Sequence, residues 1–461
     1  MRLNNFKGKR IAITSFDLQQ KEHRGIAQYT KNLIKVLHEN GAEIFLITNI
    51  AGKRIKRNKN KAFFEEVSIA DICYKFQKGS TSQGDAFRKN KILFIFKIFL
   101  NLLRIIVNRF KLNYKIINLN DLQKNIHINE SKFDFLNQVS GFIVVKGIFD
   151  ISLLRSRRYI FKIPKLNIKK NDIDLIICSS PLCIRSDYKG YAPIVQIIYD
   201  AIPIQDPHYR APLSFLNTLS DAHTNKCVYI SSSAQKIVHN ILQLSNMSNE
   251  LDILRPLPSI SLEILNNSLL INSLLGIKKP FILINCSIVS WKKIEKGIQF
   301  FNESNLGPRG FLLCIAGQTH NTRYSKHIKE LCDKNPNILL LGYVSESEKT
   351  WLYLNTSLLI STSATEGFGI PVMDSASLTI PVIANKIPSF IEIKEIFSPN
   401  QITLIDLKEK QEWINCLNKT EVFNIEDNEA KKSRIKNYSE FCKISKQETT
   451  KKILNLIGDK I

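Results

Sequence analysis

Two carboxylates lie eight positions apart in the segment TEGFGIPVMDSAS, residues 365–377. Glu366 precedes a Gly-Phe-Gly turn, whose glycines let the backbone approach a ligand closely, and Asp374 follows Pro371, a residue suited to the first turn of a helix. A helix that starts there directs free N–H groups and its positive dipole end outward, which predicts an anion site. Carboxylates beside that site accept hydrogen bonds from hydroxyl groups. The spacing therefore predicts a nucleotide-sugar site, unless Asp374 only complements the helix dipole and Glu366 is a solvated loop residue.

The elements that must position this segment alternate between strands and helices. In residues 9–50, RIAIT is a short apolar run, YTKNLIKVLHEN has helical spacing, and GAEIFLIT follows a glycine stop. Strand-like runs return at 172–180 and 193–203, and a strand leads into a helix at 228–242. This alternation predicts a doubly wound α/β domain.

A second alternating series begins near residue 280 and contains the opening segment. Prolines and polar residues between 255 and 278 mark the boundary. We expect two Rossmann-like domains that face each other across a cleft, where such folds bind ligands. Their expected ranges are 1–260, with an irregular insertion at about 51–140, then 275–435, followed by a C-terminal helix at 436–461.

The composition describes a globular protein with a basic excess. The chain has 461 residues, of which 44% are hydrophobic, and this length predicts two or three domains. Lysine and arginine number 65 against 41 acids, a net charge of +24 that favours anionic partners, although biased base composition also produces such chains. The nine cysteines form no C-x-x-C pair, which favours free thiols in a reducing compartment. The N-terminus lacks the apolar segment of a secretory signal, so we expect a cytoplasmic protein.

Residues 90–111, NKILFIFKIFLNLLRIIVNRFK, stand apart because they are almost wholly apolar. Their polar positions from Lys97 to Asn108 recur every three or four residues and form one helical stripe. The charges within the stripe argue against a helix that spans a membrane. Two interpretations stay open. The helix lies on the inner face of an anionic cell membrane, helped by the basic run at 53–61, or it is largely buried with its narrow polar edge in solvent.

The segment STSATEGFGIPVMDSASLTIPVIANKIPSFIEI resembles the signature of the retaining glycosyltransferases of family 4, similar to mannosyltransferases of surface-polysaccharide assembly. That family has the two-domain GT-B fold and a second glutamate where this chain has Asp374. RGIAQYTKNLIKVLHENGAEIFLIT, IIYDAIPIQDP and NYSEFCKISKQETTKKILNLI resemble further family segments and occur in the same order. The resemblance covers most of the chain except about 51–140.

The resemblance implies roles for the donor-side residues. Glu366 corresponds to the acid that binds hydroxyls of the donor sugar, and Asp374 to the acid that binds the ribose. Lys292 matches the lysine of an Arg-Lys pair that binds the diphosphate, while Trp291 occupies the arginine position. A cation there stabilises the leaving diphosphate, and Lys293 or Lys296 is an alternative ligand. The other donor-binding residues implied are Ser287, Gly367, Phe368, Gly369 and Ile370.

The first domain supplies three further candidates. Tyr199 and Asp200 correspond to the family's His-Asp pair, so Tyr199 either hydrogen-bonds a sugar hydroxyl or packs at a strand end. Gly25, with His23 and Arg24 beside it, corresponds to a glycine loop that approaches the donor phosphate or the acceptor. His208 is a further candidate, although a lone histidine is more often structural. The implied catalytic residues are thus Glu366, Lys292, Tyr199 and Asp200.

Together these features predict a retaining hexosyltransferase that moves a sugar, with mannose as the first candidate, from GDP-mannose or a UDP-sugar. The expected acceptor is lipid-linked or a polysaccharide, as in lipopolysaccharide and other surface-glycan biosynthesis. The signature contains no metal triad or D-x-D, so we expect neither a metal nor another cofactor. The alternative is a non-catalytic GT-B-like protein that binds carbohydrate or a partner, because Trp291, Tyr199, Asp374 and the missing glycine before Pro381 depart from the family pattern. We expect no nucleic-acid binding, since no recognisable module accompanies the charge.

Overall fold

The computed structural model describes most of the chain. The described residues are 5–20, 25–50, 70–76, 91–119, 131–187, 189–205, 211–244, 250–268, 275–319, 321–398 and 400–458. Four of the predicted features lie outside them: the basic run at 53–61, His23, Arg24 and His208. The side chains of residues 91–98 are also outside the description, although their backbone is helical.

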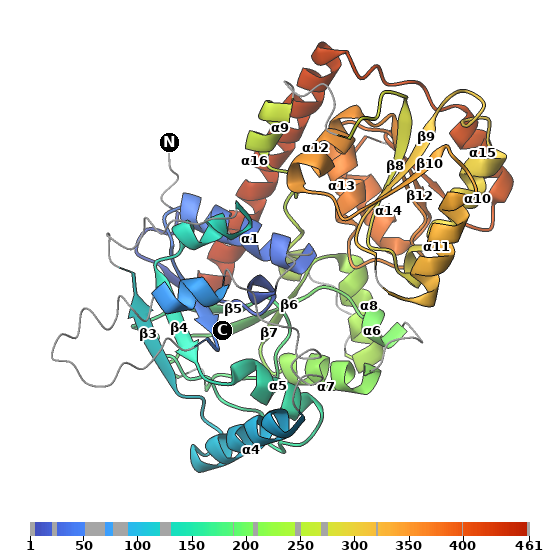
Figure 1. Cartoon of the computed structure of the whole chain (residues 1–461). Coiled ribbons are helices and arrows are strands. Elements are labelled where there is room, and N and C mark those ends of the chain that lie inside the picture. Colours follow the sequence, from blue (N-terminus) through green and yellow to red (C-terminus); the bar gives the residue numbers. More distant parts are fainter. Residues whose placement is uncertain are drawn as a thin grey trace. The chain divides into compact units, whose positions relative to one another are not determined.

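The chain divides into two compact units, each built on its own sheet (Figure 1). The first unit contains residues 1–230, 238–254 and 448–461, and the second contains 231–237 and 255–447. Helices α8 (Ser232–Leu242) and α16 (Asn428–Gly458) therefore contribute residues to both units. The predicted fold class, two α/β domains on largely parallel sheets, is confirmed.

The first unit has a seven-stranded sheet in the order β3-β4-β2-β1-β5-β6-β7. All neighbours pair in parallel except β3, which runs antiparallel to β4. Strands β4, β5 and β6 are buried at every position, as is typical of a sheet with helices on both faces. The elements are β1 (Arg10–Thr14), η1 (Asp17–Gln19), α1 (Gly25–Glu39), β2 (Glu43–Thr48), α4 (Lys91–Val107), β3 (Tyr114–Asn118), η3 (Ser131–Gln138), β4 (Gly141–Val145), α5 (Ile148–Ser156), β5 (Leu175–Cys178), β6 (Ile194–Ile198), α6 (Ile202–Gln205), α7 (Pro212–Ala222), β7 (Lys226–Tyr229) and η4 (Glu250–Asp252).

The second unit has a six-stranded, wholly parallel sheet in the order β10-β9-β8-β11-β12-β13. Its core packs apolar strand residues against helices, and the Trp413 ring stacks on Phe300 with centroids 5.0 Å apart. The elements are α9 (Leu262–Ser268), β8 (Phe281–Asn285), η5 (Ser290–Lys292), α10 (Ile294–Glu303), β9 (Leu312–Ala316), α11 (Arg323–Asp333), β10 (Ile338–Gly342), α12 (Glu346–Asn355), β11 (Leu358–Ser361), α13 (Ile370–Ser377), β12 (Val382–Asn385), α14 (Pro388–Ile396), β13 (Ile402–Ile405) and α15 (Lys410–Asn418).

In each sheet the strand order reverses beside the unit's first strand. The first sheet runs from β1 to β2 on one side and resumes with β5 on the other, and the second sheet does the same with β8, β9 and β11. Doubly wound proteins bind their ligands at the carboxyl ends of strands at such a point. Ligand-binding residues are therefore expected in the loops after β8 and β11, and in those after β1 and β5.

Candidate functional site

The opening segment lies at the reversal point of the second sheet. The loop that follows β11 carries Thr362 to Gly369, and the loop that follows β8 carries Cys286 to Lys293. Because β8 and β11 are adjacent parallel strands, both loops leave the sheet at the same edge. The sequence-predicted residues Ser287, Lys292, Glu366 and Gly367 are thus brought to one edge of one sheet.

Three hydrogen bonds fix the geometry of these two loops. The Ala364 N–H donates to the Trp291 carbonyl at 2.7 Å, and the Thr362 hydroxyl donates to the Lys292 carbonyl at 2.9 Å. From the end of β12, the Asn385 amide donates to the Ser363 carbonyl at 2.9 Å. Hydrogen bonds to the backbone carbonyls hold the loops with little freedom, so the side chains they carry are pre-positioned.

Lys292 and Glu366 form an ion pair at the centre of this edge. The Lys292 ammonium donates to Glu366 Oε1, which also accepts a hydrogen bond from the Ser363 hydroxyl at 2.8 Å. Each of the two charged side chains keeps 14% of its surface exposed. The pair combines a cation that attracts phosphate with a carboxylate that accepts from hydroxyls, and solvent reaches both.

The predicted anion site falls at the start of α13. Gly369 caps the helix in the left-handed region at φ 111°, and a Cβ on it would lie 2.4 Å from Phe390 Cε1. Only glycine fits both constraints. The Gly367 carbonyl accepts from the Ser231 hydroxyl at 2.5 Å, and Phe368 is 2% exposed, so the turn is anchored from behind. The first turn of α13 consequently presents its N–H end beside Glu366.

Asp374 has a different environment, inside α13 and only 1% exposed. Its Oδ1 accepts from the Ser259 N–H at 2.9 Å and its Oδ2 from the Ser259 hydroxyl. Burial raises the pKa of the Asp374 carboxyl from 3.8 to about 6, and the bonds from Ser259 act in the opposite direction. The next residue, Ile260, binds the Tyr438 hydroxyl through both its N–H (2.8 Å) and its carbonyl (2.9 Å). Asp374 therefore fixes the segment at 259–260 in place.

A close backbone crossing supports the loop after β8. Gly317, just after β9, has φ 147°, and a Cβ on it would lie 1.8 Å from the Cys286 carbonyl oxygen. Ser287, half-buried, follows directly, and its carbonyl accepts from the Val289 N–H at 3.0 Å. Any side chain at 317 would push the loop that carries Ser287 and Lys292 out of register.

The first unit holds the other sequence-predicted residues. The Tyr199 ring, after β6, contacts the Tyr29 ring edge-on at 5.4 Å, and burial raises the Tyr199 pKa well above its usual value. Asp200 accepts through Oδ1 from the Ile202 N–H at 3.0 Å, at the start of α6. Gly25 begins α1 at an exposed position where a Cβ would meet no atom within 4 Å. Its backbone is therefore open to a ligand, but its geometry does not demand glycine.

Sequence reasoning missed a polar cluster at the reversal point of the first sheet. Asp17, after β1, accepts a hydrogen bond from the Ser180 hydroxyl after β5, and burial raises the pKa of the Asp17 carboxyl. Beside them the Ser179 hydroxyl donates to the Thr14 carbonyl at 2.8 Å. The signal was present, because SFD follows the predicted strand RIAIT directly and SS ends the run DLIICSS.

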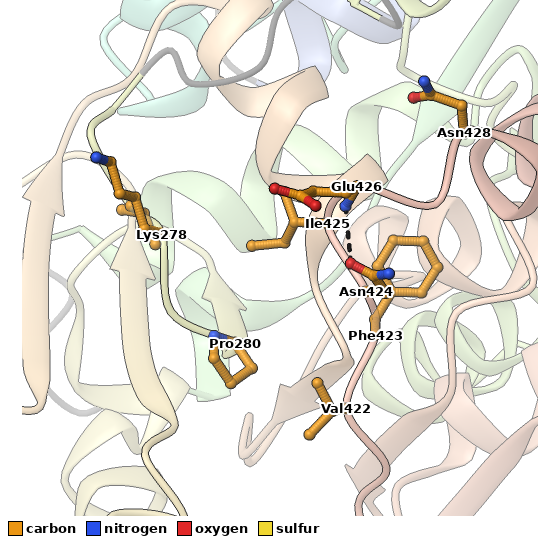
Figure 2. A pocket seen from close by; sticks show the side chains of 9 residues that line it. Lys278, Pro280, Val422, Phe423, Asn424, Ile425, Glu426 and Asn428 are labelled. Atoms are coloured by element: carbon orange, nitrogen blue, oxygen red, sulfur yellow. Dashed lines mark hydrogen bonds between the residues drawn. The ribbon is translucent and has the colours of Figure 1, made fainter.

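A pocket in the second unit lies at the opposite edge of its sheet (Figure 2). It has a volume of about 720 Å³ and is lined by Pro280, just before β8, and by residues 422–426. Phe423 is held there because its N–H donates to the Ser357 hydroxyl, just before β11. The amino ends of the strands, not the carboxyl ends, face this pocket, so it is separate from the Lys292–Glu366 pair.

The described residues contain no group of three or more His, Cys, Asp or Glu side chains placed to hold a metal ion. Among the same residues, none of the helices combines the length and apolar character needed to cross a membrane.

Comparison with known proteins shows which family the residues of the site resemble. Residues 272–437, which include Lys292, Glu366 and Asp374, match the family model of the glycosyl transferases group 1. A stretch of 225 residues is 22% identical to the serotype-specific mannosyltransferase WbdA of Escherichia coli, and it covers 43% of this chain and 26% of that protein. The chain thus spans about a quarter of the length of this curated relative.

Solved structures show the fold along the whole chain. HepE from Anabaena in complex with UDP is similar with a TM-score of 0.53 and 12% identity, over 98% of this chain and 99% of that one. WaaG, a glycosyltransferase involved in lipopolysaccharide biosynthesis, is similar with a TM-score of 0.51 and 10% identity, over 97% and 99% of the two chains. The expectation of a GT-B fold is confirmed by these likenesses.

Proposed function

We propose that this chain, whose residues 272–437 match the family model of the glycosyl transferases group 1, transfers a hexose from a nucleoside diphosphate sugar to a glycan acceptor. The observation that carries the proposal is the Lys292–Glu366 pair beside the start of α13, whose two side chains each keep 14% of their surface exposed. A cation and a helix N-terminus bind a diphosphate, and a neighbouring carboxylate binds sugar hydroxyls. These are the two halves of a nucleotide-sugar donor.

The chemistry follows from where charge develops. As the bond between sugar C1 and the phosphate oxygen breaks, negative charge accumulates on the leaving diphosphate. Lys292 and the N–H groups of Gly367 to Ile370 stabilise that charge. Glu366 fixes the sugar hydroxyls, and the acceptor hydroxyl attacks C1 from the face that the diphosphate leaves. Its proton passes to the departing phosphate oxygen, so the configuration at C1 is retained and no metal ion takes part.

The donor is a GDP- or UDP-sugar, with GDP-mannose first among the candidates. Mannose is supported by the likeness to the mannosyltransferase WbdA, and UDP by the complex of HepE. Ser287 lies on the loop that carries Lys292, where it can contact the diphosphate. Asp374 is assigned to the ribose, and because it is 1% exposed, this contact requires Ser259 to move.

The acceptor binds at the first unit, at the carboxyl ends of its strands. Tyr199, Asp200 and Gly25 supply part of this surface. Asp17 and Ser180 add a buried carboxyl and a hydroxyl at the sheet's reversal point, which are groups suited to hydroxyl-rich ligands. We assign the acceptor to the lipid-linked or polysaccharide class of surface-glycan assembly, at the cytoplasmic face of an anionic membrane.

A panel of nucleotide sugars tests the proposal most directly. GDP-mannose or a UDP-sugar should raise the melting temperature of the full chain, because a ligand that binds only the native state stabilises it. The same donor should then yield free nucleoside diphosphate when a glycan acceptor is added, with EDTA present or absent.

Two results would contradict the proposal. If no nucleotide sugar shifts the melting temperature, the donor site is wrong. If a donor binds but Glu366→Ala leaves turnover unchanged, the chain is instead a non-catalytic carbohydrate- or partner-binding protein, as the departures at Trp291 and Tyr199 would allow.

A further inference from the structure

Helix α4 packs on the first unit with its polar stripe turned partly inward. It lies alongside α5 (Figure 1). Asn101, in the middle of the predicted stripe, is 4% exposed and donates to Asp150 of α5 at 3.5 Å. Ile105 is 1% exposed and belongs to the core of the unit. The interpretation of α4 as a buried helix with its whole polar edge in solvent is therefore wrong, because Asn101 of that edge is buried.

The outward face of α4 is apolar. Its exposed positions recur at the spacing of one helical face, and they are Phe99 (53% exposed), Leu100 (42%), Leu103 (44%), Ile106 (56%) and Val107 (77%). Exposed large apolar side chains that are contiguous, rather than scattered, indicate an interaction surface. We call this set the outer face of α4.

An aromatic and basic segment extends this surface at the C-terminal end of α4. The Phe161 ring, 72% exposed, contacts the Phe110 ring with centroids 4.8 Å apart. The Lys162 ammonium lies 5.7 Å from the centroid of each of these rings. The Lys165 N–H donates to the Phe110 carbonyl and the Leu112 N–H to the Lys165 carbonyl, both at 2.8 Å, and these bonds fix the arrangement. Exposed phenylalanines with lysine or arginine beside them are typical of segments that lie at the boundary between water and lipid.

The segments that contain α4 and the Phe161–Lys162 pair carry positive charge only. Residues 86–120 contain eight lysines and arginines and residues 151–171 contain seven, and neither segment contains an acid. Some of these cations are neutralised, since Arg155 and Arg158 pair with Asp221 and Lys165 pairs with Asp187. Arg104, Arg109 and Lys162 remain exposed around the outer face of α4.

We propose that the outer face of α4 docks on an anionic lipid bilayer. The five apolar side chains enter the boundary between head groups and acyl chains, and Arg109 and Lys162 meet lipid phosphates. Charge complementarity selects this partner, because a second copy of this face would bring like charges together. The inference does not rest on sugar transfer, since it concerns only the surface of the first unit.

Vesicle binding by the full chain tests the proposal. The wild type should sediment with phosphatidylcholine vesicles that contain phosphatidylglycerol and at least tenfold less with phosphatidylcholine alone, because the basic side chains favour an anionic surface. Ile106→Glu/Val107→Glu should weaken binding to the anionic vesicles at least tenfold. Arg109→Glu/Lys162→Glu should weaken it about as much and remove most of its salt dependence.

The matched control is Val422→Glu/Ile444→Glu, which places the same charges at positions that are 57% and 54% exposed in the second unit. Its vesicle binding should equal that of the wild type. If the α4 variant Ile106→Glu/Val107→Glu binds anionic vesicles as well as the control does, the proposal is overturned. It is also overturned if the wild type does not bind anionic vesicles. A dimer in light scattering that the α4 variant abolishes identifies a second copy as the occupant instead. The melting shift with a nucleotide sugar should persist in every variant, which separates this test from that of the donor site.

Discussion

Glu366, on the loop after β11, and Asp374, inside α13, are carboxylates of one short segment that occupy opposite environments. Glu366 is paired with the ammonium of Lys292 and its side chain keeps 14% of its surface in solvent. Asp374 is 1% exposed and both its oxygens accept from Ser259. Burial raises the Asp374 pKa to about 6. Environment, not residue type, therefore gives the two carboxylates different tasks.

The difference suggests a division of labour along thirteen residues of chain, 365–377. The loop end is accessible and charged, and it is where a ligand can gain from hydrogen bonds made on binding. The helix end is dry, and it joins α13 to Ser259 and, through Ile260, to Tyr438 of α16. Substitutions at the loop end should change activity more than stability, and those at the helix end the reverse.

The largest expected effect is at the loop end. Lys292→Ala removes the cation next to the leaving diphosphate and should lower kcat/KM by roughly 10²–10³-fold with the active donor. The free energy of unfolding should change by no more than about 1 kcal/mol, because Glu366 keeps its bond from Ser363 and remains in contact with solvent. Steady-state kinetics and urea unfolding measure the two quantities.

Lys296→Ala is the matched control, since Lys296 is an exposed lysine on α10 that bonds only Gln299 among the interactions seen. It should retain the activity of the wild type. If the control loses as much activity as Lys292→Ala, the diphosphate ligand has been assigned to the wrong lysine. The claim that the loop end governs activity is then contradicted.

A smaller effect, on stability, is expected at the helix end. The Asp374 carboxyl has a pKa of about 6 in the folded chain, against 3.8 for an aspartate exposed to water. Between these pH values the folded chain keeps a proton that the unfolded chain has lost. Stability from this group therefore falls as pH rises from about 4 to about 6, by up to about 3 kcal/mol, and is level above. Glu346 and Lys349 of α12 act on Asp374 in opposite directions and alter this little.

Asp374→Asn removes this titration and should flatten the pH dependence between about 4 and 6, as urea unfolding at several pH values can measure. Donor affinity is measured on the same variant. A flattened profile with unchanged affinity assigns Asp374 to structure alone. A tenfold loss of affinity supports the ribose contact, and an unaltered pH profile refutes the contrast drawn here.

Local pattern was enough to predict much of the fold and the loop end of the site. The alternation of apolar runs with helical spacing predicted both sheets, and TEGFGIP predicted the glycine turn and the helix start. Lys292, predicted only by resemblance, proves to be in contact with Glu366, which the spacing had also predicted. These features depend on residues near one another in the chain, or on strand ends that topology brings together.

Partners from distant segments could not be predicted in this way. Ser259 lies 115 positions from Asp374, and Ser231 lies 136 positions from Gly367. A serine in a loop gives no local sign of which carboxylate or carbonyl it will meet. The sequence left open which face of α4 points outward for a related reason, because the stripe itself does not reveal that Asn101 packs against Gly147 and donates to Asp150.

The smallest expected effect concerns the contact that anchors the loop end from behind. The Ser231 hydroxyl donates to the Gly367 carbonyl at 2.5 Å and accepts from the Ala234 N–H at 2.9 Å, which caps α8. Ser231→Ala should cost about 1 kcal/mol of stability. It should also raise the donor KM and lower kcat, each a few-fold, because the amides beyond Gly367 lose their fixed position while Lys292 keeps its own.

Ser345→Ala separates the two consequences of losing Ser231. Ser345 caps α12 through the Glu348 N–H at 3.2 Å, so its loss removes a helix cap of the same kind without touching Gly367. Both variants should lose similar stability in urea unfolding, and only Ser231→Ala should change KM. If the two variants have the same KM, donor binding does not depend on the bond between Ser231 and Gly367. The exposure of Glu366 to solvent then accounts alone for its contrast with Asp374.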